Sequence, residues 1–466
     1  MILMIFLIFL IFMIHSNHKY HKNHSSDKWA KLLPIIKKRI FQNIHTFIMG
    51  KKYDIILNTL FRTDNSYSSV SLSFAKELAK THRVFYVNHP YSIKDIWDER
   101  ERPKLRERFP KILMGQTFYE TLPEIPNNFI AATPSPTLPI NFLPNNGLYD
   151  VLYRYNRQVL LRTIRRIINE HQLKDFIYLT CFDPFFVPVL PPEFGAALNI
   201  YQCIDDIETE PYVAKHGVRL ENQAAIAADI TLVTSTGLWK KFIQIQPDTH
   251  IMHNAVDISI FKDLAYKTYE RPAEIAHVTG KIVGFVGNLD PVRIDYPLLK
   301  RIAEGHPDKT LLLVGPVNSP EVYEQGLDKM PNVILTGAKR IQDVPQYLKF
   351  MDVAILPSLL NQMTRSVYPL KINEYLAGGK SCIATNFSDD IRSFQPLIRV
   401  AQSHDEFVRM IDIAADDYSE EKVAARVAVA NTNTWGDRVR QFWEIVEGHL
   451  EKKLQATSYK LQATPR

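Results

Sequence analysis

The chain has 466 residues, which is too long for one ordinary hydrophobic core and favours two domains. A hydrophobic content of 46% and a charged content of 23% are typical of globular proteins and exclude wholesale disorder. The formal net charge of +6 comes from residues 1–52, which hold nine Lys/Arg and one acidic residue, so the rest of the chain is nearly neutral. This balance excludes a surface built to bind nucleic-acid phosphates.

Residues 1–14, MILMIFLIFLIFMI, are strongly apolar, but as a helix they would span about 21 Å of a hydrocarbon core of ~30 Å. They fit a marginal membrane anchor with the basic residues 19–52 on the cytoplasmic side. A secretory signal is disfavoured, because no basic region precedes the apolar run and no small-residue cleavage site follows it. A wrongly assigned start is the third interpretation, since Met49 directly precedes the first strand. Residues 1–48 are therefore treated as an extension, and the histidines at every third position from 15 to 24 as part of a biased tract rather than metal ligands.

The three cysteines lie within or beside apolar runs and show no spacing typical of a metal site or a disulfide framework. They are interpreted as buried small hydrophobes in a reducing compartment. The protein is therefore expected to be cytoplasmic, on the inner face of the plasma membrane if the apolar segment inserts. The cysteines are Cys181, Cys203 and Cys382.

Residues 49–253 alternate strand and helix patterns, which is typical of a parallel α/β domain. The first strand, helix and strand form a right-handed βαβ unit. The proline-rich residues 100–146 are expected to wrap the surface of this domain. The predicted elements are a strand at 54–59, a helix at 66–80, the strand RVFYVN, a helix at 148–170, the strands DFIYLTCF, AALNIYQC and ADITLVTS, and a helix at 213–228.

Two polar groups follow strands in this half. The loop FRTDNSYSS carries Arg62, Asp64 and Ser68, which are either ligand-facing or part of a solvated turn. Asp205 and Asp206 end a strand, where paired carboxylates suit acid/base or metal chemistry, although one of them can instead cap the next segment.

Residues 254–434 predict a second domain of the same kind, with strands at 282–289, 310–314, 333–335, 353–356 and 382–385. The first of these strands, IVGFVGNL, ends at Gly287 and Asn288. It lacks the third glycine and the ribose-binding acid of a dinucleotide fingerprint, but a glycine at this point lets a phosphate approach the backbone. An amphipathic helix is expected at 435–452, followed by a disordered tail at 453–466 that repeats Leu-Gln-Ala-Thr.

The segment 369–385, PLKINEYLAGGKSCIAT, predicts a short helix ended by two glycines and followed by a buried strand. Pro369 suits the first helical position, so that the next free amides can hold a diphosphate. Glu374 lies roughly 7 to 8 Å further along the axis, where a carboxylate can accept hydrogen bonds from both ribose hydroxyls. Lys371 either adds a cation near the phosphates or points to solvent, and Glu374 alone can equally be a residue that favours the helix dipole.

This segment resembles the donor-site signature of the GT-B glycosyltransferases, family 4 in particular, which carry two glutamates separated by seven residues. Glu374 takes the second position, and Ser366 stands at the first, which contacts the transferred sugar in that family. The pattern Ser-x-x-Pro-Leu-Lys-x-x-Glu-Tyr-Leu-Ala is similar to that of teichuronic-acid and exopolysaccharide transferases. Further matches, in family order, are IYQCIDD, MHNAVD, IVGFVGNL, LLLVGPV and NVILTGAKR.

The resemblance implies two Rossmann-like doubly wound α/β domains facing across a cleft, with the acceptor held by the first and the nucleotide-sugar donor by the second. It implies a retaining hexosyltransferase that uses an NDP-sugar, no cofactor and no metal, and that gives the acceptor's proton to the leaving phosphate. A glycan or lipid-linked acceptor of bacterial cell-surface polysaccharide, peripheral membrane association and no nucleic-acid partner are expected. The implied residues are Arg293, Lys371 and Asp206 for catalysis; Gly287, Asn288, Arg340, Arg365, Ser366, Tyr368, Pro369, Leu370 and Glu374 for the donor; and Arg62, Asp64, Ser68 and Asp205 for the acceptor side.

Two other functions fit the same pattern. One is a nucleotide-sugar epimerase on the same fold. The other is a non-catalytic nucleotide-sugar-binding protein that lost activity with the first glutamate.

Overall fold

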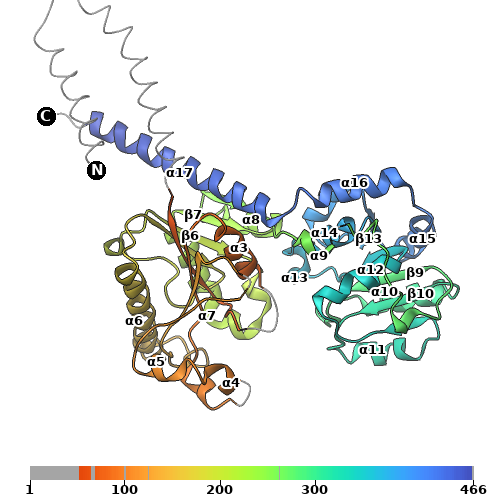
Figure 1. Ribbon diagram of the computed structural model, residues 1–466, viewed down its shortest axis with the longest axis horizontal. Helices are drawn as coiled ribbons and strands as arrows, with labels where there is room; N and C mark the ends of the chain where they lie inside the picture. Colours follow the sequence, from red (N-terminus) through yellow and green to blue (C-terminus); the bar gives the residue numbers. More distant parts are fainter. Residues whose placement is uncertain (1–51, 65–68, 99–100, 124, 262, 464–466) are drawn as a thin grey trace, which may run out of the picture. The chain divides into compact units, whose positions relative to one another are not determined.

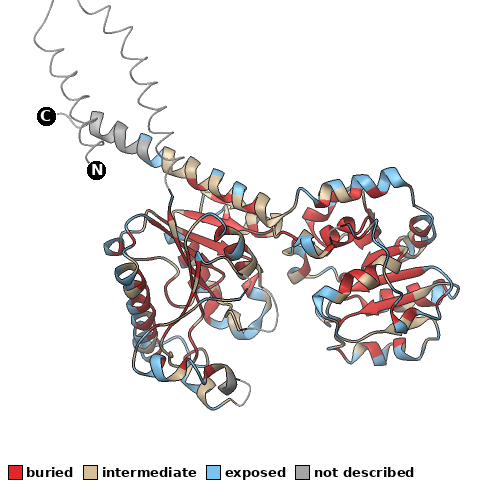
Figure 2. Ribbon diagram, viewed as in Figure 1, coloured by how far each residue is buried: buried red, intermediate tan, exposed pale blue. Residues whose placement is uncertain are grey.

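The computed structural model describes residues 52–64, 69–98, 101–123, 125–261 and 263–463. Residues 53–445 form one compact unit, and the strands of both sheets lie within it. Figure 1 shows the elements along the chain, and Figure 2 shows that most strands are buried while most helices expose one side to solvent.

The N-terminal sheet has eight strands in the order β3-β4-β2-β1-β5-β6-β7-β8. Its neighbours run parallel, except that β3 runs antiparallel to β4. The chain passes outward from β1 on one side and returns to β5 on the other, so the direction of winding switches between β1 and β5. The strands are β1 Asp54–Thr59, β2 Val84–Val87, β3 Phe118–Glu120, β4 Phe129–Thr133, β5 Phe176–Cys181, β6 Leu198–Cys203, β7 Ile230–Val233 and β8 Thr249–Ile251.

The C-terminal sheet has six strands, all parallel, in the order β11-β10-β9-β12-β13-β14. Its winding switches between β9 and β12, as in a doubly wound nucleotide-binding sheet. Strands β10, β11 and β12 are nearly continuous Val, Ile and Leu, as is typical of parallel strands covered on both faces. They are β9 Ile282–Val286, β10 Thr310–Val314, β11 Val333–Leu335, β12 Val353–Leu356, β13 Ser381–Thr385 and β14 Arg399–Ala401.

The helices pack on the sheets through apolar stripes. In the N-terminal domain a long helix, α6, runs along the sheet, and its side chains share a core cluster with those of β1, β2 and β5 (Figure 1). The helices are α3 Val70–Leu78, α4 Arg102–Leu105, α5 Phe109–Leu113, α6 Gly147–Glu170, α7 Pro211–Ala227, α8 Thr236–Phe242, α9 Ile258–Phe261, α10 Tyr296–Gly305, α11 Glu321–Glu324, α12 Val344–Phe350, α13 Gln362–Arg365, α14 Leu370–Ala377, α15 His404–Ala415, α16 Glu420–Ala430 and α17 Trp435–Ala463. Short 3₁₀ turns are η1 Ile93–Ile96, η2 Pro192–Phe194, η3 Ile207–Thr209, η4 Ala273–Ile275, η5 Leu327–Lys329, η6 Ile341–Asp343 and η7 Asp389–Phe394.

The predicted fold class is confirmed, since both domains are Rossmann-like α/β units built on mostly parallel sheets. Two local expectations differ from the structure. The proline-rich residues 100–146 include β4, a buried strand paired with β2, because the short apolar run FIAAT is long enough to join the sheet. The helix expected to end at residue 452 continues to Ala463, since nothing in the predicted tail breaks a helix before Pro465.

The first turns of α17 contact the N-terminal domain through aromatic rings. Phe442 packs edge-on against Phe74 with ring centroids 5.5 Å apart, and Trp443 stacks on Tyr53 at 6.4 Å. Through these contacts the chain packs against the first domain again after it has completed the second.

All three cysteines are buried and unpaired, as expected. Within the described ranges no helix combines the length and the apolar character needed to cross a bilayer. The apolar run at 1–14 lies outside those ranges.

Candidate functional site

The C-terminal sheet opens at its switch point. Strands β9 and β12 pair at Val283–Val353 and Gly284–Ala354, and beyond these pairs a tyrosine takes the place of direct pairing. The hydroxyl of Tyr375, on α14, accepts a hydrogen bond from the amide of Val286 (3.1 Å) and lies 3.4 Å from the carbonyl oxygen of Ile355, to which it donates. Burial raises the pKa of Tyr375 well above its usual value, which keeps the proton in place. The carboxyl ends of the two strands are thereby held apart, at the point where doubly wound sheets bind ligands.

Two glycines line the neighbouring strand ends. A Cβ atom on Gly315, after β10, would lie 1.8 Å from the carbonyl oxygen of Gly287, after β9. The amide of Gly287 donates to Val314 (2.9 Å), which fixes this close approach. Beside it, Asn288 accepts a hydrogen bond from the side chain of Asn318 (3.0 Å). Gly287 and Asn288 therefore follow a strand end, as predicted. Gly315 adds a second backbone segment without a side chain at this place.

The loops after β9 and β12 are tied together. The carbonyl oxygen of Arg293 accepts a hydrogen bond from the amide of Leu359 (2.9 Å), and Asn361 donates to the carbonyl oxygen of Val292 (2.8 Å). The residue Arg293 is exposed. Its guanidinium acts electrostatically on Asp205, where burial raises the pKa and the charge of Arg293 opposes that rise. The two predicted residues are therefore within electrostatic reach of each other.

Helix α14 carries the predicted carboxylate. Glu374 is 7% exposed, and its carboxylate accepts a hydrogen bond from the ammonium of Lys371 one turn earlier (2.8 Å). Pro369 is the residue that caps the helix, which begins at Leu370, one position after the predicted start. The amide of Leu370 donates to Tyr368 (2.8 Å) and the amide of Ile372 donates to Pro369 (3.0 Å), so these two amides of the first turn already have partners within the chain. The prediction that the first amides of this helix hold a diphosphate is therefore wrong for Leu370 and Ile372, and the Lys371–Glu374 pair is the charged feature of this turn.

A cavity of about 590 Å³ lies beside the backbone of Ser366. The carbonyl oxygen of Ser366 accepts a hydrogen bond from the hydroxyl of Ser235, the residue that caps α8 (2.6 Å). A Cβ atom on Gly237 would lie 2.8 Å from the carbonyl oxygen of Arg365, so the two backbones meet closely at this wall. The lining residues are Gly237, Gln362, Arg365, Ser366, Asn386, Phe387, Ser388, Asp389 and Arg392.

Two residues expected at the donor have other partners. Tyr368 is buried, stacks on His253 with ring centroids 4.3 Å apart, and receives a hydrogen bond from Asn373 (3.1 Å). Arg340 is exposed and forms a bidentate ion pair with Asp343 (2.8 and 2.9 Å). In this conformation the ring of Tyr368 packs on His253, and the guanidinium of Arg340 is bound by Asp343 in the next turn.

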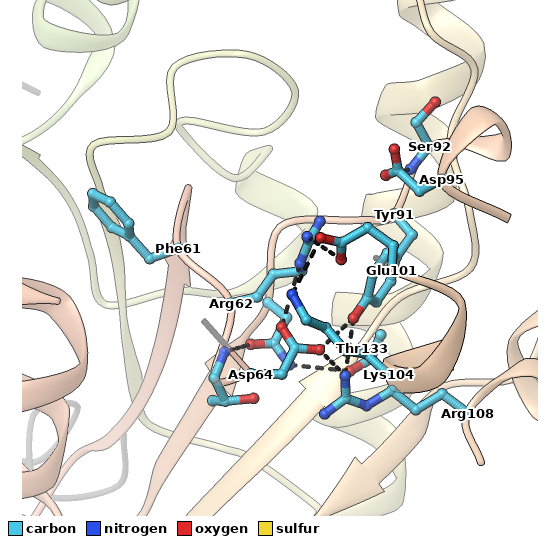
Figure 3. Close-up of polar contacts among 12 residues, drawn as sticks. Phe61, Arg62, Asp64, Tyr91, Ser92, Asp95, Glu101, Lys104, Arg108 and Thr133 are labelled. Atoms are coloured by element: carbon cyan, nitrogen blue, oxygen red, sulfur yellow. Dashed lines mark hydrogen bonds and ion pairs between the residues drawn. The ribbon is translucent and has the colours of Figure 1, made fainter. Parts of the chain in front are cut away.

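Two of the acceptor-side candidates belong to a charged network in the N-terminal domain (Figure 3). Asp64 bonds to both Arg108 and Tyr91, and Arg62 pairs with Glu101 (2.8 Å) while its guanidinium lies 4.2 Å from the centre of the Tyr91 ring. Burial by itself would raise the pKa of Asp64, but the Tyr91 hydroxyl and the Arg108 charge hold it below its usual value.

The second carboxylate on Arg108 is Glu120, at 2.8 Å. The network is therefore balanced within the protein and accounts for Arg62 and Asp64 without a ligand. Ser68 lies outside the described residues.

The paired aspartates after β6 have different surroundings. Asp206 caps η3, accepting from the amide of Glu208 (3.3 Å), and forms an ion pair with Lys241 (3.1 Å). Asp205 is half-buried. Of the two, Asp206 is thus the capping residue, and Asp205 is the one whose pKa is affected by the charge of Arg293.

A fully buried glutamate lies behind this pair. Glu221 accepts a hydrogen bond from the hydroxyl of Tyr201 (2.9 Å), and the ammonium of Lys241 lies 4.0 Å from its other oxygen. Burial raises the pKa of Glu221 to about 7, although the charge of Lys241 opposes the shift.

The structure thus brings the segments around Gly287, Arg293 and Glu374 to one end of the C-terminal sheet. The sequence interpretation missed Gly315, which the Gly-Pro pair after LLLV could have indicated, and Tyr375, which carries no local signal. It also missed His89 and Asp183, which follow strands of the N-terminal sheet. Among the described residues no cluster of three or more His, Cys, Asp or Glu side chains is arranged to hold a metal ion.

Comparison with solved structures identifies the fold as GT-B. HepE of Anabaena in complex with UDP superposes with a TM-score of 0.55 at 15% identity, covering 85% of this chain and 100% of HepE. An α,α-trehalose-phosphate synthase (UDP-forming) of Burkholderia vietnamiensis gives a TM-score of 0.60 at 10% identity, covering 85% and 99%. At these identities the likeness concerns the fold alone.

Sequence comparison finds similarity to glycosyltransferases over part of the chain. Residues 280–415 match the family model described as Glycosyl transferases group 1. The chain is 28% identical over 207 residues to a Bacillus subtilis (strain 168) protein named "Putative teichuronic acid biosynthesis glycosyltransferase TuaH", and the match covers 43% of this chain. The chain spans about half the length (51%) of that curated relative. The resemblance to the GT-B glycosyltransferases is therefore confirmed.

Proposed function

We propose that the protein is a retaining, metal-independent hexosyltransferase that moves a sugar from an NDP-sugar to a glycan or glycolipid acceptor in cell-surface polysaccharide biosynthesis. The observation that carries this proposal is the opened switch point of the C-terminal sheet, where two glycine backbones lie at strand ends and Tyr375 anchors the helix that carries the Lys371–Glu374 pair. A diphosphate can approach the glycine backbones, and the carboxylate of Glu374 can accept hydrogen bonds from ribose hydroxyls.

The comparisons support a nucleotide-sugar donor, since HepE is described in complex with UDP and with UDP-glucose. The name of the TuaH relative refers to teichuronic acid biosynthesis, which supports a glycan acceptor. Arg293 would stabilise charge on the departing diphosphate, an electrostatic contribution often worth several kcal/mol. A lipid-linked acceptor would place the enzyme peripherally on the cytoplasmic face of the membrane.

The donor is identified by thermal shift with UDP-, GDP- and dTDP-sugars, because a ligand bound only to the folded state raises the melting temperature. We expect Glu374→Ala to weaken binding of the selected donor and Arg293→Ala to lower kcat. Glu420→Ala on α16 and Arg409→Ala on α15 are matched exposed controls. Unchanged binding in the first variant together with unchanged turnover in the second removes this site assignment.

Two other functions are separated by product analysis. An epimerase would return an isomerised sugar nucleotide and leave every acceptor unmodified. A non-catalytic binder, which the serine at position 366 favours, would bind the donor tightly without transfer or slow hydrolysis.

A further inference from the structure

Both domains contribute to the cavity of about 590 Å³ beside Ser366. Gly237, on α8, belongs to the N-terminal domain, and the other lining residues follow β12 or β13 of the C-terminal sheet. Sites for small molecules typically enclose about 300–1,000 Å³. The cavity is therefore large enough for a sugar ring.

Hydrogen bonds hold the walls of this cavity in place. Thr236, at the start of α8, donates its amide (2.9 Å) and its hydroxyl (2.5 Å) to the buried carboxylate of Asp390. The hydroxyl of Thr385, at the end of β13, donates to the carbonyl oxygen of Ser358, after β12 (2.7 Å). The lining is thus preformed, and a preformed site loses less conformational entropy when it binds a ligand.

The lining carries an excess of positive charge. Among the described residues that line the cavity, Asp389 is the one carboxylate, and the ammonium of Lys240 binds it (2.7 Å). The pKa of Asp389 is lowered chiefly by this hydrogen bond and also by the charge of Arg392. The guanidinium groups of Arg365 and Arg392 make no hydrogen bond or ion pair with any residue that the structure describes. Both residues are exposed, so a ligand in the cavity can reach them.

The neutral lining groups suit sugar hydroxyls. The hydroxyl of Ser388 accepts a hydrogen bond from the amide of Asp390 (3.3 Å), which leaves its proton free to be donated. The side-chain amide of Asn386 donates to Gln402 (2.9 Å), which leaves its carbonyl oxygen free to accept. A ligand with several hydroxyl groups therefore finds both donors and acceptors here.

The cavity adjoins the surface proposed for the diphosphate. Strand β12 lies between β9 and β13, so the loop after β13 is the next but one along the same edge of the sheet from Gly287. Neighbouring strands lie about 4.8 Å apart, which is close to the width of one sugar ring. Ser366 precedes Pro369 by three residues, so the same loop leads from the cavity to α14. A sugar attached to a diphosphate at the switch point can therefore extend into the cavity.

We propose that this cavity binds a uronic acid residue of the saccharide substrate, with Arg365 and Arg392 holding its carboxylate. The position of the cavity assigns this residue to the donor, which is then a nucleoside-diphospho-uronic acid. This inference rests on the proposed glycosyl transfer and names the class of sugar that it moves. A guanidinium can hold a carboxylate through two parallel hydrogen bonds, and such bonds are roughly twice as strong as those between neutral groups. A neutral hexose would leave both guanidiniums without a counter-charge.

The inference is tested by calorimetric binding of sugar nucleotides that differ only at the sixth carbon. The pairs are UDP-glucuronate with UDP-glucose, UDP-galacturonate with UDP-galactose, and GDP-mannuronate with GDP-mannose. In at least one pair the acidic member should bind about 10–100-fold more tightly, as expected for hydrogen bonds to a charged group. The acceptor is the other source of a carboxylate, so n-octyl glucuronide and n-octyl glucoside form a fourth pair. These two should bind within about twofold of each other.

Substitutions assign the preference to the cavity. Arg365→Gln and Arg392→Gln should each lower the ratio of acidic to neutral donor affinity about 10-fold, and Arg392→Glu should make the neutral donor the better ligand. The ratio cancels any effect on the nucleotide, which both members of a pair share. Arg409→Gln, at an exposed arginine of α15 outside the cavity, should keep the wild-type ratio. Thermal unfolding followed by circular dichroism checks that all four variants are folded.

The outcomes separate this inference from the proposed function. A wild-type chain that binds the neutral member of every pair as tightly as the acidic member overturns the uronic acid site and leaves glycosyl transfer in place. A preference that survives both arginine-to-glutamine substitutions overturns it as well, because the carboxylate is then held elsewhere. An arginine-dependent preference in the octyl pair alone overturns the assignment to the donor. A chain that binds no sugar nucleotide and transfers no sugar overturns the proposed function.

Discussion

A Cβ atom on Gly315 would lie 1.8 Å from the carbonyl oxygen of Gly287, well inside van der Waals contact. The backbone fixes where that Cβ atom lies, and the oxygen belongs to the backbone, so neither atom can swing aside. The ends of β9 and β10 can therefore adopt this arrangement only while position 315 has no side chain. The residue that must lack a side chain for stability therefore lies at the surface proposed to bind the diphosphate.

Gly315→Ala is expected to lower the free energy of unfolding by about 1–3 kcal/mol or more, because the strand ends must shift to admit the methyl group. Donor-induced thermal shift should fall with it. The control is Gly147→Ala at the start of α6, where an added Cβ meets nothing within 4 Å. Urea unfolding of both variants measures the effect, and equal stability of the two would contradict the clash.

Tyr375→Phe removes the hydroxyl between β9 and β12. The amide of Val286 and the carbonyl of Ile355 would lose a partner in a buried setting, which costs about 1–3 kcal/mol. Tyr323→Phe, at a tyrosine that is 57% exposed, is the matched control and should be neutral. Denaturant titration distinguishes the two variants; a neutral Tyr375→Phe would show that the bridge contributes nothing to stability.

Asp64→Asn tests whether the N-terminal charged network is structural. The variant leaves the positive charge of Arg108 short of a partner in a site where both side chains are largely buried, so a loss of about 3–5 kcal/mol is expected. Asp343→Asn breaks the exposed pair with Arg340 and should cost about 0–1 kcal/mol. The acceptor KM should not change in either variant. A stable Asp64→Asn protein with a raised acceptor KM would instead support the original acceptor-side assignment.

Glu221→Gln tests the buried glutamate through pH. Since its pKa is raised from 4.5 to about 7, the folded state binds more protons than the unfolded state between those values. Wild-type stability contributed by this group is therefore greatest below about pH 4.5 and falls as the pH rises to about 7. The variant does not titrate, so its stability relative to wild type should rise between pH 5 and pH 8, by up to about 3 kcal/mol.

Unfolding at several pH values measures that difference, with Glu420→Gln, an exposed residue on α16, as the control. A difference between Glu221→Gln and wild type that does not vary with pH would show that Glu221 has an ordinary pKa.

The architecture could be predicted because it depends on local patterns. The strands at 54–59, 310–314, 333–335 and 353–356 lie where continuous apolar runs end in glycine, proline or polar residues. The segment around Glu374 was recognisable for the same reason, since strand, loop and helix are contiguous in sequence. The strand FIAAT was missed because its five residues stand among prolines and show no periodicity.

The contacts within the candidate sites could not be predicted, because they join distant segments. His89 and Asp183 are 94 residues apart and meet only because β2 and β5 flank β1. In the sequence Asp64 fits a polar turn, because its partner Arg108 lies 44 residues later in the chain. Side-chain partners of this kind depend on strand order, which a single sequence does not specify.

Tyr375 and Glu374 are consecutive residues on one short helix. The first is anchored to two strands of the sheet, and the second is the group expected to recognise the ribose. A change in the spacing between β9 and β12 must therefore shift the carboxylate as well. Mutations deep in the strands, far from any ligand, should for this reason alter how tightly a nucleotide is held.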